Sequence, residues 1–306
     1  HHHGYNQDNE QMEKKFARTS ELLKKQINND PENPIPHHNL AISYLDRNMN
    51  DECIKEAQEA IRLFELQNSD SQLRLLSYYS ASVAFYRKNE LSNAEKYAIK
   101  LLSIYSEYLD AHCLLSSIYF LKKKYVKCIE ATTKFLDLLK SIESNSKKAL
   151  LVPFNTLQHA RLAYSRMSIV FFEQKKEQEG LQALRNSISS AENKWEPYFI
   201  ISKHFAEKDD SILAERFLVD GIKENPGNKD LLYYAAELNE KSGATDKALN
   251  NLKTITKYHP DETPAHYKQG LIHLEKSYYD EAIKSFKSVT ERYPDNFESL
   301  FHMAIA

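Results

Sequence analysis

Histidine and cysteine are the residues of this sequence that could bind a metal ion or supply a nucleophile. Of the 12 histidines, the first three residues of the chain read as a tag remnant, and the others are scattered. His266 and His273 are seven residues apart, which is too far along a helix for one ion. His112, Cys113 and Cys128 form the best cluster, but Cys128 occupies a packing position. The sequence therefore predicts no metal and no other cofactor.

The three cysteines, including Cys53, are an odd number and contain no C-x-x-C pair. They fit small core residues in a reducing compartment better than a disulfide framework. No signal peptide is recognisable, so we expect a cytoplasmic protein, although a targeting signal could lie outside this sequence.

Catalytic and phosphate-binding motifs are missing from the sequence. There is no G-x-G-x-x-G, G-x-x-x-x-G-K-[ST], G-x-S-x-G or H-E-x-x-H. The net charge is −2 and no basic run is longer than residues 122–124, which argues against nucleic-acid binding. No apolar run of about 18 residues indicates a membrane span. We expect a protein that is not an enzyme.

A repeat of 34 residues organises the chain. Residues 263–296 place the small residues Gly270 and Ala282 in two successive helices, with Phe286 one turn later and Pro294 at the exit. Small residues let the two helices approach closely, the bulky residue fills the gap, and proline ends the helix. Earlier copies of this pattern are Ala236, Ala248, Leu252 and Pro260; Ser202, Ala214, Leu218 and Pro226; and Ser168, Gly180 and Leu184.

This pattern resembles the tetratricopeptide repeat, a helix–turn–helix unit that stacks into a solenoid. The resemblance implies an all-α, right-handed superhelix of antiparallel helix pairs, with about seven full repeats and a partial repeat at each end. The full repeats are expected to start near Pro34, Leu75, Leu109, Arg161, Trp195, Lys229 and Thr263.

The expected boundaries follow from that register. After the tag (1–4) come a partial repeat with a second helix (5–33), repeats 1–3 (34–142), an insertion (143–160), repeats 4–7 (161–296) and a partial repeat with a first helix (297–306). The extra residues 68–74 indicate a longer loop. Residues 143–160 indicate a lengthened helix, a polar loop and a new helix with Asn155 as N-cap. The partial repeats mark either an excised fragment or terminal caps.

In such a solenoid the first helices line a concave face that binds a protein or peptide partner. Apolar and aromatic side chains at the groove positions of the first four repeats are candidate contacts, and their alternative role is packing between repeats. The candidates are Ile42, Leu45, Tyr79, Val83, Tyr86, Phe120, Ile169 and Phe172.

The groove lacks the two-carboxylate clamp of chaperone-binding members of this family. The clamp uses Lys and Asn on one first helix and Asn, Lys and Arg on the next two. The matching positions hold His38 and Ile42, then Ser80, then Asp110 and Leu114. The resemblance therefore implies that an EEVD-type chaperone tail is not the ligand.

A further resemblance is carried by RTSELLKKQINNDPENPIPHHNLAISYLDRNMNDECIKEAQEAI. This stretch is similar to the entry into the repeat region that follows a family-2 glycosyltransferase domain in some bacterial proteins. Three functions remain open: a non-catalytic binding scaffold, an accessory region of such a transferase, and a peptide-sensing regulator. The last two would need a further domain outside this sequence.

Overall fold

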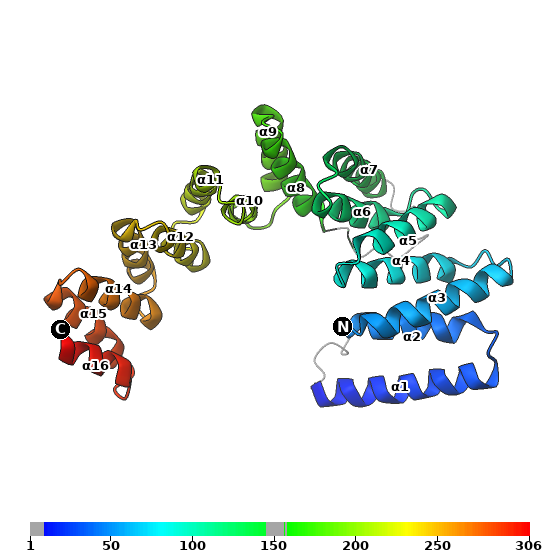
Figure 1. The fold of residues 1–306 in the computed structure, drawn as a ribbon, viewed down its shortest axis with the longest axis horizontal. Helices are drawn as coiled ribbons and strands as arrows, with labels where there is room; N and C mark the ends of the chain where they lie inside the picture. The colour runs from blue at the N-terminus through cyan, green and yellow to red at the C-terminus, as the bar shows by residue number, and fades with distance from the viewer. Residues whose placement is uncertain (1–8, 145–155, 157) are drawn as a thin grey trace. The chain divides into compact units, whose positions relative to one another are not determined.

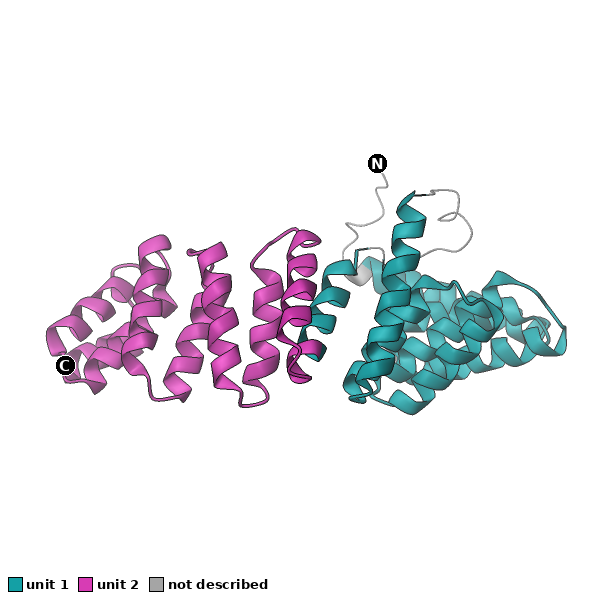
Figure 2. Ribbon diagram, turned by 90° about the horizontal axis from the view of Figure 1, so that it is seen from above, with its two compact units in different colours: residues 1–170 teal, residues 171–306 magenta. Residues whose placement is uncertain are grey.

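The computed structural model describes residues 9–144, 156 and 158–306, and these residues form sixteen α-helices and no strand (Figure 1). The chain divides into two compact units, residues 1–170 and 171–306 (Figure 2). Each unit is a stack of antiparallel helix pairs, as the repeat pattern predicts.

Unit 1 contains the helices of repeats 1–3 after a leading helix. Their bounds are α1 (Asn9–Asn29), α2 (Pro34–Asp46), α3 (Asn50–Leu66), α4 (Gln72–Arg87), α5 (Leu91–Ile104), α6 (Leu109–Leu121) and α7 (Tyr125–Ser144). The next helix, α8 (Ala160–Glu173), ends in unit 2.

Unit 2 contains the remaining helices. Their bounds are α9 (Glu177–Ser189), α10 (Glu196–Ala206), α11 (Ser211–Glu224), α12 (Lys229–Lys241), α13 (Thr245–Tyr258), α14 (Thr263–Glu275), α15 (Tyr279–Thr290) and α16 (Phe297–Ile305). Repeats 5, 6 and 7 are the pairs α10–α11, α12–α13 and α14–α15.

In the helix pairs that lie within one unit, the seam is built from two small residues twelve positions apart, and repeat 4, which is divided between the units, has small residues at the same two positions. All fourteen of these residues are buried: Ala41, Ser82, Ser116, Ser168, Ser202, Ala236 and Gly270 on the first helices, and Cys53, Ala94, Cys128, Gly180, Ala214, Ala248 and Ala282 on the second. Two serines add a hydrogen bond across the seam, because the Ser82 and Ser202 hydroxyls donate to the carbonyls of Ala94 and Ala214. Cysteine fits this position as a compact apolar side chain.

The turn inside each pair has a constant geometry. Seven residues after the small residue of the first helix, the backbone adopts a positive φ in every repeat, a conformation that costs most residues energy. These residues are Asn48, Asn89, Lys123, Lys175, Asp209, Gly243 and Ser277. Four of the seven are Gly, Asn or Asp, which adopt a positive φ at low cost, whereas at Lys123, Lys175 and Ser277 the packing of the two helices imposes the turn.

Helix starts follow the expected register closely. α2, α6, α12 and α14 begin at the predicted residues, and α8 and α10 begin within one residue of them. The cap side chains of Asn228 and Asn296 accept hydrogen bonds from the amides of Leu231 and Ser299. Such caps satisfy amide groups that the first turn of a helix leaves unpaired.

The extra residues 68–74 do not form a longer loop, so that prediction was wrong. α4 already begins at Gln72, and α3 and α4 have 17 and 16 residues, against 14 in α5 and 13 in α6. Both helices are thus extended by three residues, and only one extra residue lies between them. Extension adds helical hydrogen bonds and buries Phe64, which a longer loop would not.

The second insertion agrees with the prediction in its first part. α7 has 20 residues, so it is lengthened as expected. The predicted cap Asn155 lies outside the described residues, and α8 begins at Ala160, one residue before the expected start of repeat 4 near Arg161.

Candidate functional site

The first helices of repeats 1–3 contact one another in sequence, α2 with α4 and α4 with α6. Six of the eight candidate contact residues lie on these three helices and are half-buried: Ile42, Leu45, Tyr79, Val83, Tyr86 and Phe120. We call this set the first-helix face of unit 1. Each of these side chains keeps some accessible surface, which a bound partner could cover.

The inner side of this face rests on the core of unit 1. Val83, Tyr86 and Phe120 pack against a buried cluster that includes Phe85 and Ile118. Leu45 packs against a neighbouring cluster around Leu40 and Tyr44. The core therefore fixes the position of each side chain and leaves its outer surface accessible, which reduces the conformational entropy that binding would cost.

Tyr79 differs from the other five residues of the face. Its ring lies 5.6 Å from that of Tyr108, centroid to centroid, and burial holds the pKa of Tyr79 well above 10.0. The carboxylate of Asp110 acts in the same direction. The Tyr79 hydroxyl therefore stays neutral and belongs more to the packing between α4 and α6 than to an open surface.

Ile169 and Phe172 have little surface to offer a partner, since they are only 4% and 7% exposed. The Phe172 ring packs against Phe217, with ring centroids 5.0 Å apart, and closely covers Gly180. Both side chains are therefore too buried to belong to the first-helix face.

A buried histidine, His38, connects α2 and α4 beneath the first-helix face. The Nδ1 atom of His38 lies 2.9 Å from the Ser77 hydroxyl, and burial lowers the pKa of His38 to about 4. The ring is therefore neutral at physiological pH. One hydrogen bond and a neutral ring make His38 a structural link between α2 and α4.

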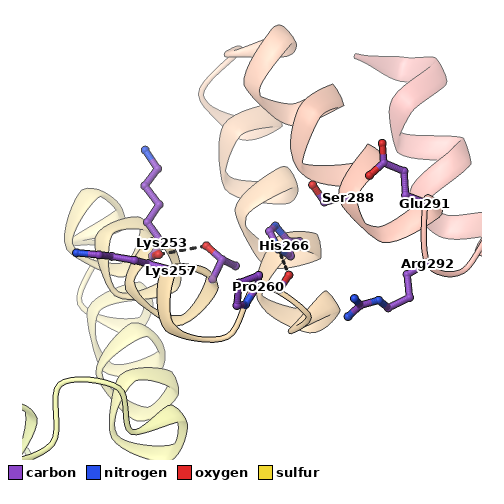
Figure 3. Close-up of a pocket in the computed structure, with 8 residues that line it drawn as sticks. Lys253, Lys257, Pro260, His266, Ser288, Glu291 and Arg292 are labelled. Atoms are coloured by element: carbon purple, nitrogen blue, oxygen red, sulfur yellow. Dashed lines mark hydrogen bonds between the residues drawn. The ribbon is translucent and has the colours of Figure 1, made fainter.

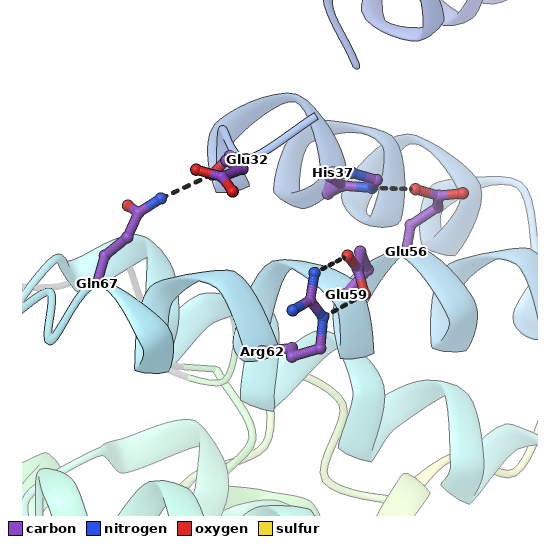
Figure 4. A network of polar contacts seen from close by, with 6 residues as sticks. All are labelled: Glu32, His37, Glu56, Glu59, Arg62 and Gln67. Atoms are coloured by element: carbon purple, nitrogen blue, oxygen red, sulfur yellow. Dashed lines mark hydrogen bonds and ion pairs between the residues drawn. The ribbon is translucent and has the colours of Figure 1, made fainter. Parts of the chain in front are cut away.

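Acidic residues near the α2–α3 pair are engaged with partners (Figure 4). His37 Nδ1 lies 2.6 Å from a carboxylate oxygen of Glu56, and Arg62 binds both oxygens of Glu59. The Arg62 guanidinium holds the pKa of Glu59 below 4.5. The first of these contacts links α2 to α3, and the second lies within α3.

Cys113 lies near a histidine other than the one expected. Its sulfur is 4.0 Å from Nδ1 of His159, which follows the insertion. Burial raises the pKa of the Cys113 thiol to about 11, so the thiol is protonated and poorly nucleophilic at neutral pH. Among the described residues, no group of three or more His, Cys, Asp or Glu side chains is placed to hold a metal ion.

A hollow of about 400 Å³ lies in unit 2 between α11, α12 and α13. Leu218, Val219, Ile222 and Leu238 line its apolar part, and Glu215 lies at its edge. The sequence pattern did not indicate this hollow, because the repeat predicts close packing at every junction. One residue in the sequence does indicate the hollow: Glu215 occupies the position that Leu249 has in the next repeat.

Comparison with known proteins supports the repeat assignment. A model of the tetratricopeptide repeat matches residues 230–262 and 265–296, which belong to repeats 6 and 7. Residues 230–296 contain two tetratricopeptide repeats. The constant seam and turn geometry place the other helix pairs in the same register as these two tetratricopeptide repeats.

Solved tetratricopeptide-repeat structures are similar in fold. The yeast Tom70 structure matches with a TM-score of 0.52 and 16% identity, covering 95% of this chain and 57% of that one. The C-terminal part of a repeat-containing protein from Cytophaga hutchinsonii has a TM-score of 0.52 and 14% identity, covering 82% and 93%. No curated protein matches the sequence significantly.

The described helices include none that combines the length and the apolar composition needed to cross a membrane.

Proposed function

We propose that this chain is a non-catalytic scaffold that binds a peptide segment of a partner protein on the first-helix face of unit 1. The observation that carries the proposal is the row of half-buried apolar side chains on three adjoining first helices. Partly exposed aromatic and aliphatic groups that a core holds in place are typical energetic centres of protein interfaces.

The face offers apolar contacts rather than charges. Leu45, Tyr86 and Phe120 occupy equivalent positions on α2, α4 and α6, and Ile42 and Val83 form a parallel row one turn earlier. A peptide crossing these helices would bury side chains against both rows. We therefore expect the ligand to be an extended or helical segment with two or more large apolar side chains.

The test is selection of binding peptides from a phage-displayed library of random dodecapeptides against the full chain. The dissociation constant of an enriched peptide is then measured by fluorescence polarisation for the wild type and for Tyr86→Ala. Removing a central aromatic contact should weaken binding by roughly tenfold or more, as is common for interface centres.

A neighbouring residue provides the matched control. Phe85 adjoins Tyr86 in the sequence but is buried in the core of unit 1, so Phe85→Leu reduces stability without removing a contact of the face. Peptide affinity should survive in Phe85→Leu at a temperature where both variants are folded. Equal losses in the two variants, or enriched peptides that bind Tyr86→Ala as well as the wild type, would contradict the proposal.

A further inference from the structure

A pocket of about 560 Å³ in unit 2 is lined by cationic side chains (Figure 3). Lys253 and Lys257 come from α13, His266 from the first turn of α14, and Arg292 from the segment after α15. Glu291 is the one carboxylate in the lining that the structure describes. The lining holds three cations and one carboxylate, and Arg292 is paired with Asp261 just outside the lining, so the two lysines carry the charge that remains without a partner.

The two lysines have no carboxylate to neutralise them. They lie four residues apart on α13, where like charges repel each other, and neither takes part in an ion pair among the described residues. No acidic residue stands three or four positions from either lysine within the helix. By contrast, Lys223 on α11 pairs with Asp220 at 2.8 Å.

The opposite wall of the pocket is held in place. The Arg292 guanidinium binds the backbone oxygen and the carboxylate of Asp261, which uses two of its five N–H groups. Nε2 of His266 lies 3.0 Å from the backbone oxygen of Pro260. Figure 3 shows Arg292 extending toward Pro260 and His266, while Lys253 and Lys257 come from the opposite side and their ammonium groups point away from Arg292.

Comparison with the preceding repeat shows that the fold does not require cationic side chains at these positions. Thirty-four residues earlier, the positions of Lys253 and Arg292 are occupied by Val219 and Tyr258, and the position of Lys257 by the paired Lys223. Stacking of helix pairs therefore does not require the three cations. Their gathering at one junction needs a separate explanation.

We propose that this pocket binds a phosphate monoester, either on a small molecule or on a phosphorylated peptide side chain. A dianion matches the charges of the two unpaired lysines, whereas a single carboxylate would leave one of them unbalanced. The long, flexible lysine side chains fold their ammonium groups over the anion, and the free N–H groups of Arg292 donate from the opposite wall. This site lies outside the first-helix face of unit 1, so it can be tested independently of the proposed scaffold function.

The test is isothermal titration of the full chain at low ionic strength with two probes. One is inorganic phosphate, and the other is a blocked pentapeptide with one phosphoserine among alanines, used beside its unphosphorylated form. We expect saturable binding at one site. The Lys253→Gln/Lys257→Gln variant should lose roughly tenfold or more in affinity, because each charge-assisted hydrogen bond contributes about 1.5–3 kcal/mol.

Two variants control for charge and folding. Lys96→Gln/Lys100→Gln removes an equally exposed lysine pair with the same spacing on α5 of unit 1, and it should leave the affinity unchanged. Lys253→Arg/Lys257→Arg should retain binding. Tighter binding of the phosphopeptide than of phosphate identifies a peptide as the source of the group, and the reverse identifies a small molecule. Absence of saturable binding, or equal losses in both glutamine variants, overturns the proposal.

Discussion

Repeats 6 and 7 share one register and one unit, yet they fill the same seam in two ways. In repeat 6 the small residue is Ala236 and the bulky residue is Leu252, whereas repeat 7 has Gly270 and Phe286. A Cβ atom at position 270 would lie 2.5 Å from the Phe286 ring, too close for any real contact. Gly270 lacks the methyl group of Ala236, and the space this leaves accommodates the larger ring of Phe286. The two positions therefore change together, and their combined side-chain volume stays similar.

The junctions before and after repeat 6 also differ from each other, in the side chain that fills the space between the helix pairs. Leu249 is buried against Ile272 and Leu252 where repeats 6 and 7 meet. At the equivalent position before repeat 6, Glu215 leaves the hollow between α11, α12 and α13. The seam within a pair is therefore kept closely packed, and the junctions between pairs are where the repeats diverge.

The largest expected effect breaks the seam of repeat 7. Gly270→Ala should lower the free energy of unfolding by up to about 2 kcal/mol, because overpacking costs about 1–3 kcal/mol and alanine regains roughly 1 kcal/mol as a helix former. Native-state hydrogen exchange of the α14 and α15 amides measures this local change.

The double variant Gly270→Ala/Phe286→Leu reproduces the residues of repeat 6. It should recover most of the lost stability, which gives a clear coupling energy between the two positions. Ala236→Gly, which has no ring to accommodate, should cost only the helix propensity of about 1 kcal/mol. Additive effects at positions 270 and 286 would show that the ring and the methyl group do not compete for space.

A smaller effect is expected at the junction before repeat 6. Glu215→Leu should raise the free energy of unfolding by about 1 kcal/mol, because leucine fills the hollow as Leu249 does at the next junction. The change is measured as an increase in melting temperature. The lost ion pair with Lys247 matters little, since both side chains are more than half exposed.

Glu215→Gln separates the two contributions. It removes the ion pair without adding an apolar side chain, and the melting temperature should hardly change. If Glu215→Gln stabilises unit 2 as much as Glu215→Leu, relief of charge rather than packing explains the gain.

The smallest effect concerns one buried histidine. His273 replaces the Asn239 of repeat 6 and lies 3.3 Å from the Ser285 hydroxyl, and burial lowers its pKa below 6.5. In the unfolded chain the ring takes up a proton near its ordinary pKa, so the unfolded state binds more protons as the pH falls. The contribution of His273 to stability is complete above about pH 6.5 and declines below it.

His273→Asn should therefore make the hydrogen exchange of α14 and α15 less sensitive to pH between neutral and mildly acidic conditions. The readout is the ratio of protection at the two pH values in variant and wild type. An unchanged ratio would mean that His273 is protonated equally readily in the folded and unfolded chain.

The sequence predicted the seams because they depend on residue size at a fixed spacing. Every small residue proposed for a seam is buried, including Cys53 and Cys128. The partner of Cys113 could not be predicted, since His159 follows an insertion whose path the spacing does not determine. The cationic pocket could not be predicted from the sequence for a similar reason, because only the stacking of the helix pairs brings Arg292 to the same pocket as the two lysines.

The first-helix face was predicted more coarsely than the seams. Residue type identified the apolar positions, but it could not distinguish half-buried Tyr86 from buried Phe172, because both stand one turn after the small residue. The degree of exposure depends on what the neighbouring helix places above each side chain, and that differs between repeats. The choice of contact residues among apolar candidates therefore needs the structure.

The matched extension of α3 and α4 has a consequence for how such arrays change length. These two helices run antiparallel, so three residues added to the end of one and three to the start of the other leave every downstream contact in register. An insertion in only one of them would displace its side chains by most of a turn. Insertions at this junction are therefore tolerated when they lengthen both helices by the same number of residues. A sequence alignment that places the whole insertion between the helices misassigns residues in both of them.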